Sequence, residues 1–471
     1  MDSAVIVTPI NLGKKLPPFR AESLQFRLHC DADRENASGE VVGEFCHFRD
    51  MSETDVSLSM HSYFVESDPQ RPTVFFFNGG PGASSTPLHF QGFGPYVHVG
   101  SEGNEHNFAH NDETLLDVAD LVFVDPIGTG FNRIPKAGEP GSPAERWLSP
   151  GGDAAVCAAA VRAWLKHHGK QSERVFLCGQ SYGSTRVSMM SVLLEDLELA
   201  GVALVSPGLS FTALTREIGN DMLPILTMPT MAVAAHYHLA ANNDMSAMDV
   251  YCAARKFALE QYAKAVHAGN DLDDETRREV AAELSAWIGL STPVILERGL
   301  KVDAERFMTE LLGNPDRRIG SLDVRSVGST APVTDRPTND PALVVGRPFG
   351  RTEAYMRQVF GLDSRLPYTG LSFEVNGRWG WHSNDPIRRF YHDATRELSE
   401  ALRQRPSLRV LAAAGIFDMS TPALATRHAM TRAEMPAERV EVIELPGGHT
   451  IYDTKDNRTA LGERLRSLIT G

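Results

Sequence analysis

The residues best suited to covalent chemistry lie in one pentapeptide, Gly179-Gln-Ser-Tyr-Gly183. An apolar run typical of a buried strand precedes it, and a helical pattern follows it. Where a strand turns sharply into a helix, the turn residue projects its side chain from the end of the sheet, and small residues two positions before and after avoid clashes. This context, which a chance match in a loop would lack, predicts that Ser181 is a nucleophile.

A serine hydroxyl reacts only when a base takes its proton and a third group holds that base in one tautomer. Of the 16 histidines, His449 is favoured because it follows an expected strand within Pro446-Gly-Gly-His449 and is the last in the chain. Asp418 also follows an expected strand, so we predict that it is the orienting acid, although an aspartate there could simply cap the next helix. Asp125 is the rival acid, but it precedes the serine and breaks the order serine, acid, histidine.

Acyl transfer also requires hydrogen-bond donors for the developing oxyanion. One predicted donor is the backbone N–H of Tyr182, the residue after the nucleophile. The other is expected from the glycine run Asn78-Gly-Gly-Pro-Gly82, and we choose Gly80, because backbone without side chains can approach a substrate closely. A phosphate-binding loop is not indicated, since no Lys-Ser/Thr pair follows the glycines.

The elements that must position these residues alternate between strand and helix, which predicts a parallel sheet with helices on both faces. Alternating segments at Leu24–Leu28 and Ser62–Val65 predict an antiparallel edge. The expected buried strands are Thr73–Phe77, Asp120–Asp125, Arg174–Leu177, Ala203–Val205, Leu408–Leu411 and Val440–Ile443, and the expected core helices are Asp153–Lys166, Gly183–Leu199 and Pro422–Met430.

The alternation of strands and helices is interrupted between Gly208 and Trp381. We predict a mainly helical cap there, with helices at Ala247–His267, Asp274–Gly289 and Asp303–Leu312, and a mobile loop at 326–341, rich in Ser, Thr and Pro. The predicted division is a first core part at 1–207, the cap at 208–381 and a second core part at 382–471.

Composition excludes several classes of protein. The chain has 471 residues, of which 42% are hydrophobic and 23% charged, as in ordinary globular proteins. The sequence contains no apolar run of about 18 residues, so no membrane span is predicted. A net charge of -14 argues against a nucleic-acid partner. Residues 1–20 resemble a loose leader whose basic residues follow its apolar stretch, the reverse of a secretory signal, so a cytoplasmic location is expected.

Five cysteines without a CxxC pair indicate reduced, mostly buried thiols rather than disulfides or a zinc site: Cys30, Cys46, Cys157, Cys178 and Cys252. No cofactor or metal is expected. The expected partner is a peptide or a small acyl or amide substrate, and a homodimer is left open.

Taken together, the motifs resemble the serine carboxypeptidase family of α/β-hydrolases, of the bacterial, intracellular type. The resemblance rests on Asn78-Gly-Gly-Pro-Gly-Ala-Ser-Ser85, Leu121-Val-Phe-Val-Asp-Pro-Ile-Gly-Thr-Gly-Phe131, Gly179–Gly183, Gly415–Asp418 and Gly447–His449, in that order. It implies a helical cap over the site. It also implies that Asn78, with Gly79 and Gln180 beside it, binds the carboxylate at the substrate's C-terminus.

Two positions depart from the family pattern. The family usually has glutamate just before the nucleophile, where this chain has Gln180, and a second glutamate three residues before the proline of Gly94-Pro95, where it has Gly92. In the family these acids recognise the terminal carboxylate while protonated. A glutamine can still donate a hydrogen bond, so a carboxypeptidase is the leading hypothesis. The alternatives are an acyltransferase or esterase with the same triad and, third, a non-catalytic binding protein.

Overall fold

The computed structural model describes residues 19–28, 41–50, 56–65, 67–98, 108–134, 147–216, 219–240, 244–332, 338–343, 352–353, 355–356, 367–381, 392–432 and 434–471. Most of the expected leader, Cys30 and residues 333–337 of the expected loop lie outside these ranges.

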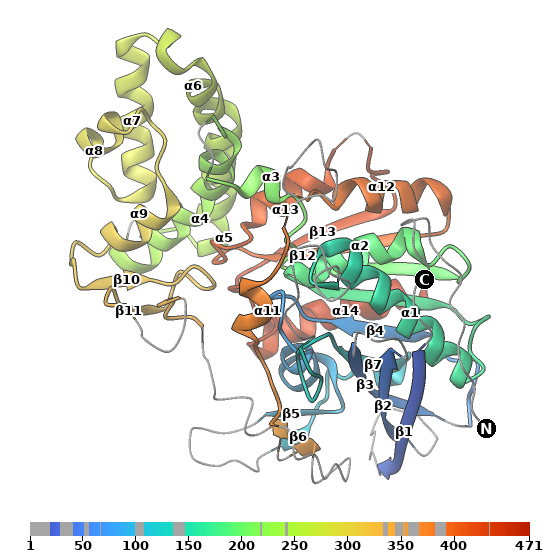
Figure 1. Cartoon of the computed structure of the whole chain (residues 1–471). Helices are drawn as coiled ribbons and strands as arrows, with labels where there is room; N and C mark the ends of the chain where they lie inside the picture. The colour runs from blue at the N-terminus through green and yellow to red at the C-terminus, as the bar shows by residue number, and fades with distance from the viewer. Residues whose placement is uncertain are drawn as a thin grey trace.

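A nine-stranded sheet forms the centre of the molecule, in the order β1-β2-β3-β7-β4-β8-β9-β12-β13 (Figure 1). Its strands are β1 (Phe19–Leu28), β2 (Val41–Asp50), β3 (Ser57–Val65), β4 (Thr73–Phe77), β7 (Asp120–Asp125), β8 (Val175–Gln180), β9 (Leu199–Val205), β12 (Arg409–Gly415) and β13 (Val440–Leu445). The pairings β1–β2, β2–β3 and β3–β7 are antiparallel, and all the others are parallel. The expected α/β architecture is therefore confirmed.

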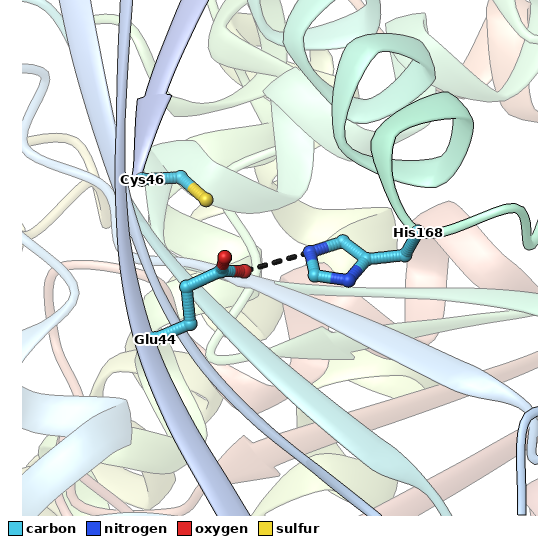
Figure 2. A group of neighbouring side chains, drawn as sticks. All are labelled: Glu44, Cys46 and His168. Atoms are coloured by element: carbon cyan, nitrogen blue, oxygen red, sulfur yellow. Dashed lines mark ion pairs between the residues drawn. The ribbon is translucent and has the colours of Figure 1, made fainter. Parts of the chain in front are cut away.

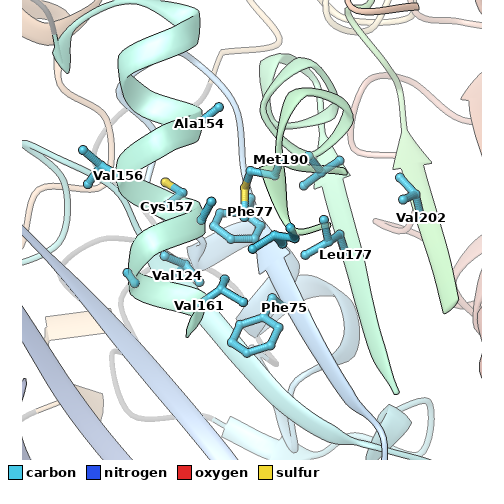
Figure 3. Packing of buried hydrophobic residues seen from close by; sticks show 14 of the residues in the cluster. Phe75, Phe77, Val124, Ala154, Val156, Cys157, Val161, Leu177, Met190 and Val202 are labelled. Carbon is cyan, nitrogen blue, oxygen red and sulfur yellow. The ribbon is translucent and has the colours of Figure 1, made fainter. Parts of the chain in front are cut away.

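Helices cover both faces of this sheet. They are α1 (Pro150–His167), α2 (Tyr182–Leu193), α12 (Thr395–Gln404), α13 (Ala423–Met430) and α14 (Lys455–Thr470). Side chains alternate between the faces of a strand, so Phe75 and Phe77 of β4 belong to the apolar cluster that includes residues of α1 and α2 (Figure 3). Phe76 belongs to a second cluster, which includes Leu465 of α14. Burial on both faces explains why the parallel strands are continuous apolar runs.

Residues 208–381 contain most of the remaining helices, which gather on one side of the sheet (Figure 1). These are α3 (Phe211–Leu214), α4 (Met222–Leu239), α5 (Ala247–Phe257), α6 (Ala263–Ala268), α7 (Asp274–Ile288), α8 (Thr292–Glu297), α9 (Ala304–Glu310) and α11 (Phe373–Gly377), with the π-helical turn η4 (Ala258–Tyr262) and the 3-10 turn η5 (Gly269–Asp271). Their apolar cluster continues into Ile416 and Phe417, just after β12. The insertion therefore packs directly on the loop that carries the predicted acid.

Short elements complete the fold. The π-helical turn η1 (Leu88–Phe93) and the 3-10 turn η2 (Leu115–Asp117) join the first strands, and two small hairpins are formed by β5 (Tyr96–His98) with β6 (Phe108–His110) and by β10 (Arg317–Ile319) with β11 (Val327–Ser329). No helix among the described residues is long and apolar enough to cross a membrane.

Three elements differ from the expectation. The sequence analysis missed α4, because an almost wholly apolar helix has no polar face to reveal its period, and Pro229 lies inside it. Helix α2 ends at Leu193 rather than near Leu199, where β9 begins. The loop expected at 326–341 contains a strand, because Val327–Ser329 pairs with β10.

Candidate active site

Ser181 occupies the sharp turn between β8 and α2. Its backbone angles, φ 58° and ψ −128°, are strained for a residue other than glycine. A Cβ atom at Gly179 would lie 2.3 Å from the carbonyl oxygen of Gly183, and one at Gly183 would lie 2.3 Å from the carbonyl oxygen of Phe77. Both glycines are thus sterically required, which is the reason the sequence analysis gave for this motif.

Asp418 and His449 meet above the ends of β12 and β13. His449 Nδ1 lies 2.7 Å from Asp418 Oδ2. The carboxylate is fully buried and also accepts hydrogen bonds from the backbone N–H groups of Ser420 (2.9 Å) and Thr421 (3.0 Å) and from the Thr421 hydroxyl (2.6 Å). These donors hold the aspartate as an acceptor for the imidazole.

The charge near His449 favours its protonated form. Burial lowers the pKa of the imidazole, but the charge and hydrogen bond of Asp418, with a smaller contribution from Asp340, outweigh burial and raise the pKa above its ordinary value. A base of this kind takes a proton readily and acts at neutral to mildly alkaline pH.

His449 is also tied to the nucleophile turn. Its carbonyl oxygen accepts hydrogen bonds from Gln180 Nε2 (3.1 Å) and Ser206 Oγ (2.8 Å). Gln180 directly precedes Ser181, whose own N–H donates to Val205 at 2.9 Å. The structure therefore brings the predicted nucleophile, acid and base to the same end of the sheet.

The rival acid, Asp125, has other partners. Its Oδ2 atom lies 2.9 Å from His61 Nε2 and accepts a 2.9 Å hydrogen bond from the Tyr368 hydroxyl, while its Oδ1 atom accepts one from the N–H of Ser85. Asp125 therefore supports the loop after β4, which holds the predicted oxyanion donor Gly80, and none of these hydrogen bonds involves His449.

That loop lies against the nucleophile. A Cβ atom on Gly79 would be 2.6 Å from the backbone nitrogen of Tyr182 and 2.8 Å from Ser181 Cβ, so only glycine fits there. Gly80 is exposed and has a φ of +100°, which favours glycine. Tyr182 is the first residue of α2, so no carbonyl of that helix can accept its N–H. The predicted donor Tyr182 directly follows Ser181, and the predicted donor Gly80 directly follows Gly79, which lies against Ser181.

Gln180 lies at the centre of a neutral hydrogen-bond network. Its Oε1 atom accepts hydrogen bonds from Asn78 Nδ2 and from the Tyr452 hydroxyl. The Tyr452 ring lies beside Gly92, where a Cβ atom would be 3.6 Å from it. The two departures from the family pattern are therefore linked through Tyr452. Burial raises the pKa of the Tyr452 hydroxyl, which keeps it neutral.

The sequence analysis missed a bridging segment, residues 320–326, that belongs to the insertion. Its Ser321 carbonyl accepts hydrogen bonds from the N–H groups of Met419 (2.9 Å) and Ser420 (3.0 Å), and its Leu322 carbonyl accepts one from the N–H of His449 (2.6 Å). Asp340 in turn accepts a 2.7 Å hydrogen bond from the N–H of Ser321. This segment joins the acid loop to the histidine loop, and nothing in its sequence indicated that role.

A buried ion pair also missed from the sequence supports the nucleophile helix. Arg186 Nε donates to Asp153 Oδ2 at 2.7 Å, and its Nη1 donates to the Asn78 carbonyl at 2.6 Å. The Tyr182 hydroxyl reaches the same carboxylate oxygen at 3.1 Å. These contacts fix α2 against α1 and against the glycine loop.

A serine at a strained strand-to-helix turn, on a mostly parallel sheet with a carboxylate-held imidazole, defines the α/β-hydrolase class. Residues 47–273 match the family model described as serine carboxypeptidase. This match covers slightly less than half of the chain and confirms the resemblance to the serine carboxypeptidase family that the motifs show. The bacterial, intracellular type stays a prediction.

Individual relatives match over short segments. Serine carboxypeptidase-like 36 of Arabidopsis thaliana is 28% identical over 175 residues, which cover 34% of this chain and 33% of that protein. The pheromone-processing carboxypeptidase KEX1 of Leptosphaeria maculans is 44% identical over 69 residues, 14% of this chain and 10% of that protein. The matched segments thus span a third or less of these relatives.

The similarity in fold extends over nearly the whole chain. The prohormone-processing carboxypeptidase Kex1 of Saccharomyces cerevisiae superposes with a TM-score of 0.51 at 12% identity, covering 96% of this chain and 91% of that one. This match shows the shared fold.

Proposed function

We propose that the chain is a serine carboxypeptidase that releases the C-terminal residue of a peptide through an acyl-enzyme on Ser181. One observation carries the proposal: the 2.7 Å contact between His449 and Asp418 is held beside the strained serine turn. The match of residues 47–273 to the serine carboxypeptidase family model supports it.

The proposed reaction has two halves. Ser181 Oγ attacks the scissile carbonyl carbon while His449 Nε2 takes the hydroxyl proton, and the N–H groups of Gly80 and Tyr182 stabilise the oxyanion. The C–N bond then breaks, and His449 gives its proton to the leaving amine. In the second half a water molecule attacks the acyl ester, again with His449 as base, and restores the serine.

Recognition of the substrate's carboxylate is proposed for Asn78 and Gln180. Each side-chain amide has two N–H donors. Among the described residues, Asn78 donates to Gln180 Oε1 and also interacts with the Tyr452 hydroxyl, whereas Gln180 donates to the His449 carbonyl. A substrate carboxylate would take the second N–H of Gln180 and compete with Tyr452 for Asn78, and Gly79 lets its backbone approach. Both residues are nearly fully buried, so their hydrogen bonds would be little screened by water.

The insertion is proposed to influence substrate choice. Near its end, Trp379 and Trp381 pack against Tyr182, with ring centroids 5.2 and 5.7 Å away, and Trp381 also contacts Phe211 at 4.8 Å. These rings form an aromatic wall behind the nucleophile. Changing Trp381 to Ala should therefore change the preferred substrate side chain more than it changes the rate of acylation by a small aryl ester.

The decisive assay compares N-blocked dipeptides that have a free C-terminus with the same peptides carrying a C-terminal amide, and with aryl esters. Products are read by mass, and Ser181→Ala is the control. A carboxypeptidase releases the last residue of the free acid and leaves the amide almost intact. Equal cleavage of acid and amide, or hydrolysis of esters alone, would contradict the proposal.

The same assay, run with added amine and alcohol acceptors, tests the acyltransferase alternative. Transfer products that outnumber hydrolysis products at low acceptor concentration would favour it. The cytoplasmic location, the absence of a nucleic-acid partner and a homodimer stay predictions.

A further inference from the structure

Three side chains with metal-binding atoms meet between the antiparallel edge of the sheet and the end of α1. Glu44 and Cys46 are two residues apart on β2, so they point to the same face, and both are fully buried. His168 follows the last residue of α1 and points toward them (Figure 2). One carboxylate oxygen, the thiol sulfur and one imidazole nitrogen all lie within 4.8 Å of one another.

A second histidine approaches the same carboxylate. His168 Nε2 lies 2.7 Å from Glu44 Oε2, and His167 Nε2 lies 3.8 Å from Glu44 Oε1. The His168 ring is held by aromatic contacts with Trp164, at a centroid distance of 4.1 Å, and with Phe64, at 4.9 Å. The group is therefore positioned by packing, as a metal site requires.

We propose that Glu44, Cys46 and His168 bind a zinc ion, with His167 as the fourth ligand. Thiolate, imidazole and carboxylate are the ligands that zinc takes in proteins, and a closed set of four is typical of structural sites. The sequence analysis expected no zinc site because Cys46 lacks a nearby partner cysteine; these ligands are brought together only by the fold.

Charge favours this occupant. Zinc with one thiolate and one carboxylate is neutral overall, so a dication would compensate two anionic groups in a buried place. Ligand atoms around zinc are each about 2.0 to 2.3 Å from the metal, so the present 2.7 Å contact has to widen slightly. Without a metal, burial and the Glu44 carboxylate raise the pKa of the Cys46 thiol, so the thiol stays protonated.

The rival interpretation is a simple buried ion pair between Glu44 and a protonated His168. It accounts for the 2.7 Å distance, yet within the described part of the chain His168 Nε2 makes no hydrogen bond. It leaves the Cys46 thiol as a hydrogen-bond partner of Glu44 and His167 as a second, more distant ion-pair partner at 3.8 Å. A metal would instead bind all four side chains directly.

The position suggests a structural role. Strand β2 and the end of α1 supply none of Ser181, Asp418 or His449, so the metal would fasten the antiparallel edge of the sheet to the first helix. Its removal should lower the stability of the protein without entering the chemical step.

The test uses the untagged full chain. We would strip metals with a chelator, remove the chelator, and titrate with Co²⁺, whose complexes with thiolate show a charge-transfer band in the near ultraviolet. The expected result is one equivalent bound, with that band lost in Cys46→Ser and kept in Cys252→Ser, a matched change of a cysteine outside the cluster. Competition with Zn²⁺ should abolish the band, and zinc affinity should fall by more than the roughly 10 to 100-fold that changes beyond the ligands cause.

X-ray absorption of the zinc-loaded unmodified protein provides a second measurement, independent of whether the variants fold. One sulfur at about 2.3 Å, together with nitrogen or oxygen ligands, is expected. Failure to retain about one equivalent of zinc through gel filtration, a coordination shell without sulfur, or a cobalt band that survives in Cys46→Ser would each overturn the proposal.

Discussion

Replacing Gln180 by glutamate tests the neutral network beside the nucleophile. In the unmodified chain, Gln180 Nε2 donates to the His449 carbonyl at 3.1 Å, while Oε1 accepts from Asn78 and Tyr452. A protonated glutamic acid reproduces this pattern, because its O–H can donate to the same carbonyl. An ionised one has no donor and sets a negative oxygen against the carbonyl.

The size of the effect follows from these contacts. Loss of a buried hydrogen bond costs about 1 to 3 kcal/mol. If all of this energy is lost from the transition state through displacement of His449, kcat/KM falls by roughly 5 to 150-fold. A substrate carboxylate about 4 Å from the ionised glutamate adds a repulsion of about 1 to 4 kcal/mol. Burial raises the pKa of a carboxyl group, so this loss should begin above the ordinary glutamate range.

Two substrates separate these contributions. For the unmodified protein, kcat/KM should rise with pH as His449 loses its proton, at a pH above the ordinary histidine value because the pKa of His449 is raised. For Gln180→Glu, the profile should become bell-shaped. An ester without a free carboxylate reports only the displacement of His449, and a peptide with a free C-terminus reports displacement plus repulsion.

Tyr452→Phe is the matched control, because it removes the other donor to Gln180 Oε1 without adding a charge. It should lower kcat/KM modestly and leave the shape of the pH profile unchanged. If Gln180→Glu and the unmodified protein show the same profile for both substrates, Gln180 neither positions His449 nor approaches the substrate. An acidic optimum in the unmodified protein would show that another carboxyl group recognises the substrate.

Three further changes test the rest of the site. Ser181→Ala should reduce turnover by about 10⁴ to 10⁶-fold with little loss of stability, and should abolish labelling by a fluorophosphonate; labelling of the variant would disprove the nucleophile. Asp340→Asn removes a negative charge that raises the pKa of His449, so the rise of kcat/KM should move to lower pH, and a move to higher pH would refute that electrostatic role. Gly183→Ala places a Cβ atom 2.3 Å from a backbone oxygen and should destabilise the fold by more than about 1 kcal/mol in urea unfolding, whereas Gly377→Ala, with no atom near its Cβ position, should not.

Much of the site could be predicted because its signals are local. Gly-x-Ser-x-Gly after an apolar run determines a strained turn, since the two glycines are required by contacts within that turn and with the neighbouring strand. Parallel strands buried on both faces produce continuous apolar runs, so the sheet could be recognised segment by segment. Asp418 and His449 follow such runs, and their order along the chain agreed with that of the fold class.

Contacts between distant segments were decided only by the tertiary structure. The hydrogen bonds from Met419 and His449 to the bridging segment join residues about a hundred positions apart, and no pattern in either segment encodes them. The tertiary structure likewise brings His61 and Tyr368 to Asp125 and places Tyr452 beside Gly92. Sequence determines which residues can lie at the end of a strand, because that depends on neighbours along the chain. Which side chains meet there depends on how the strands and the insertion pack, which is a property of the whole fold.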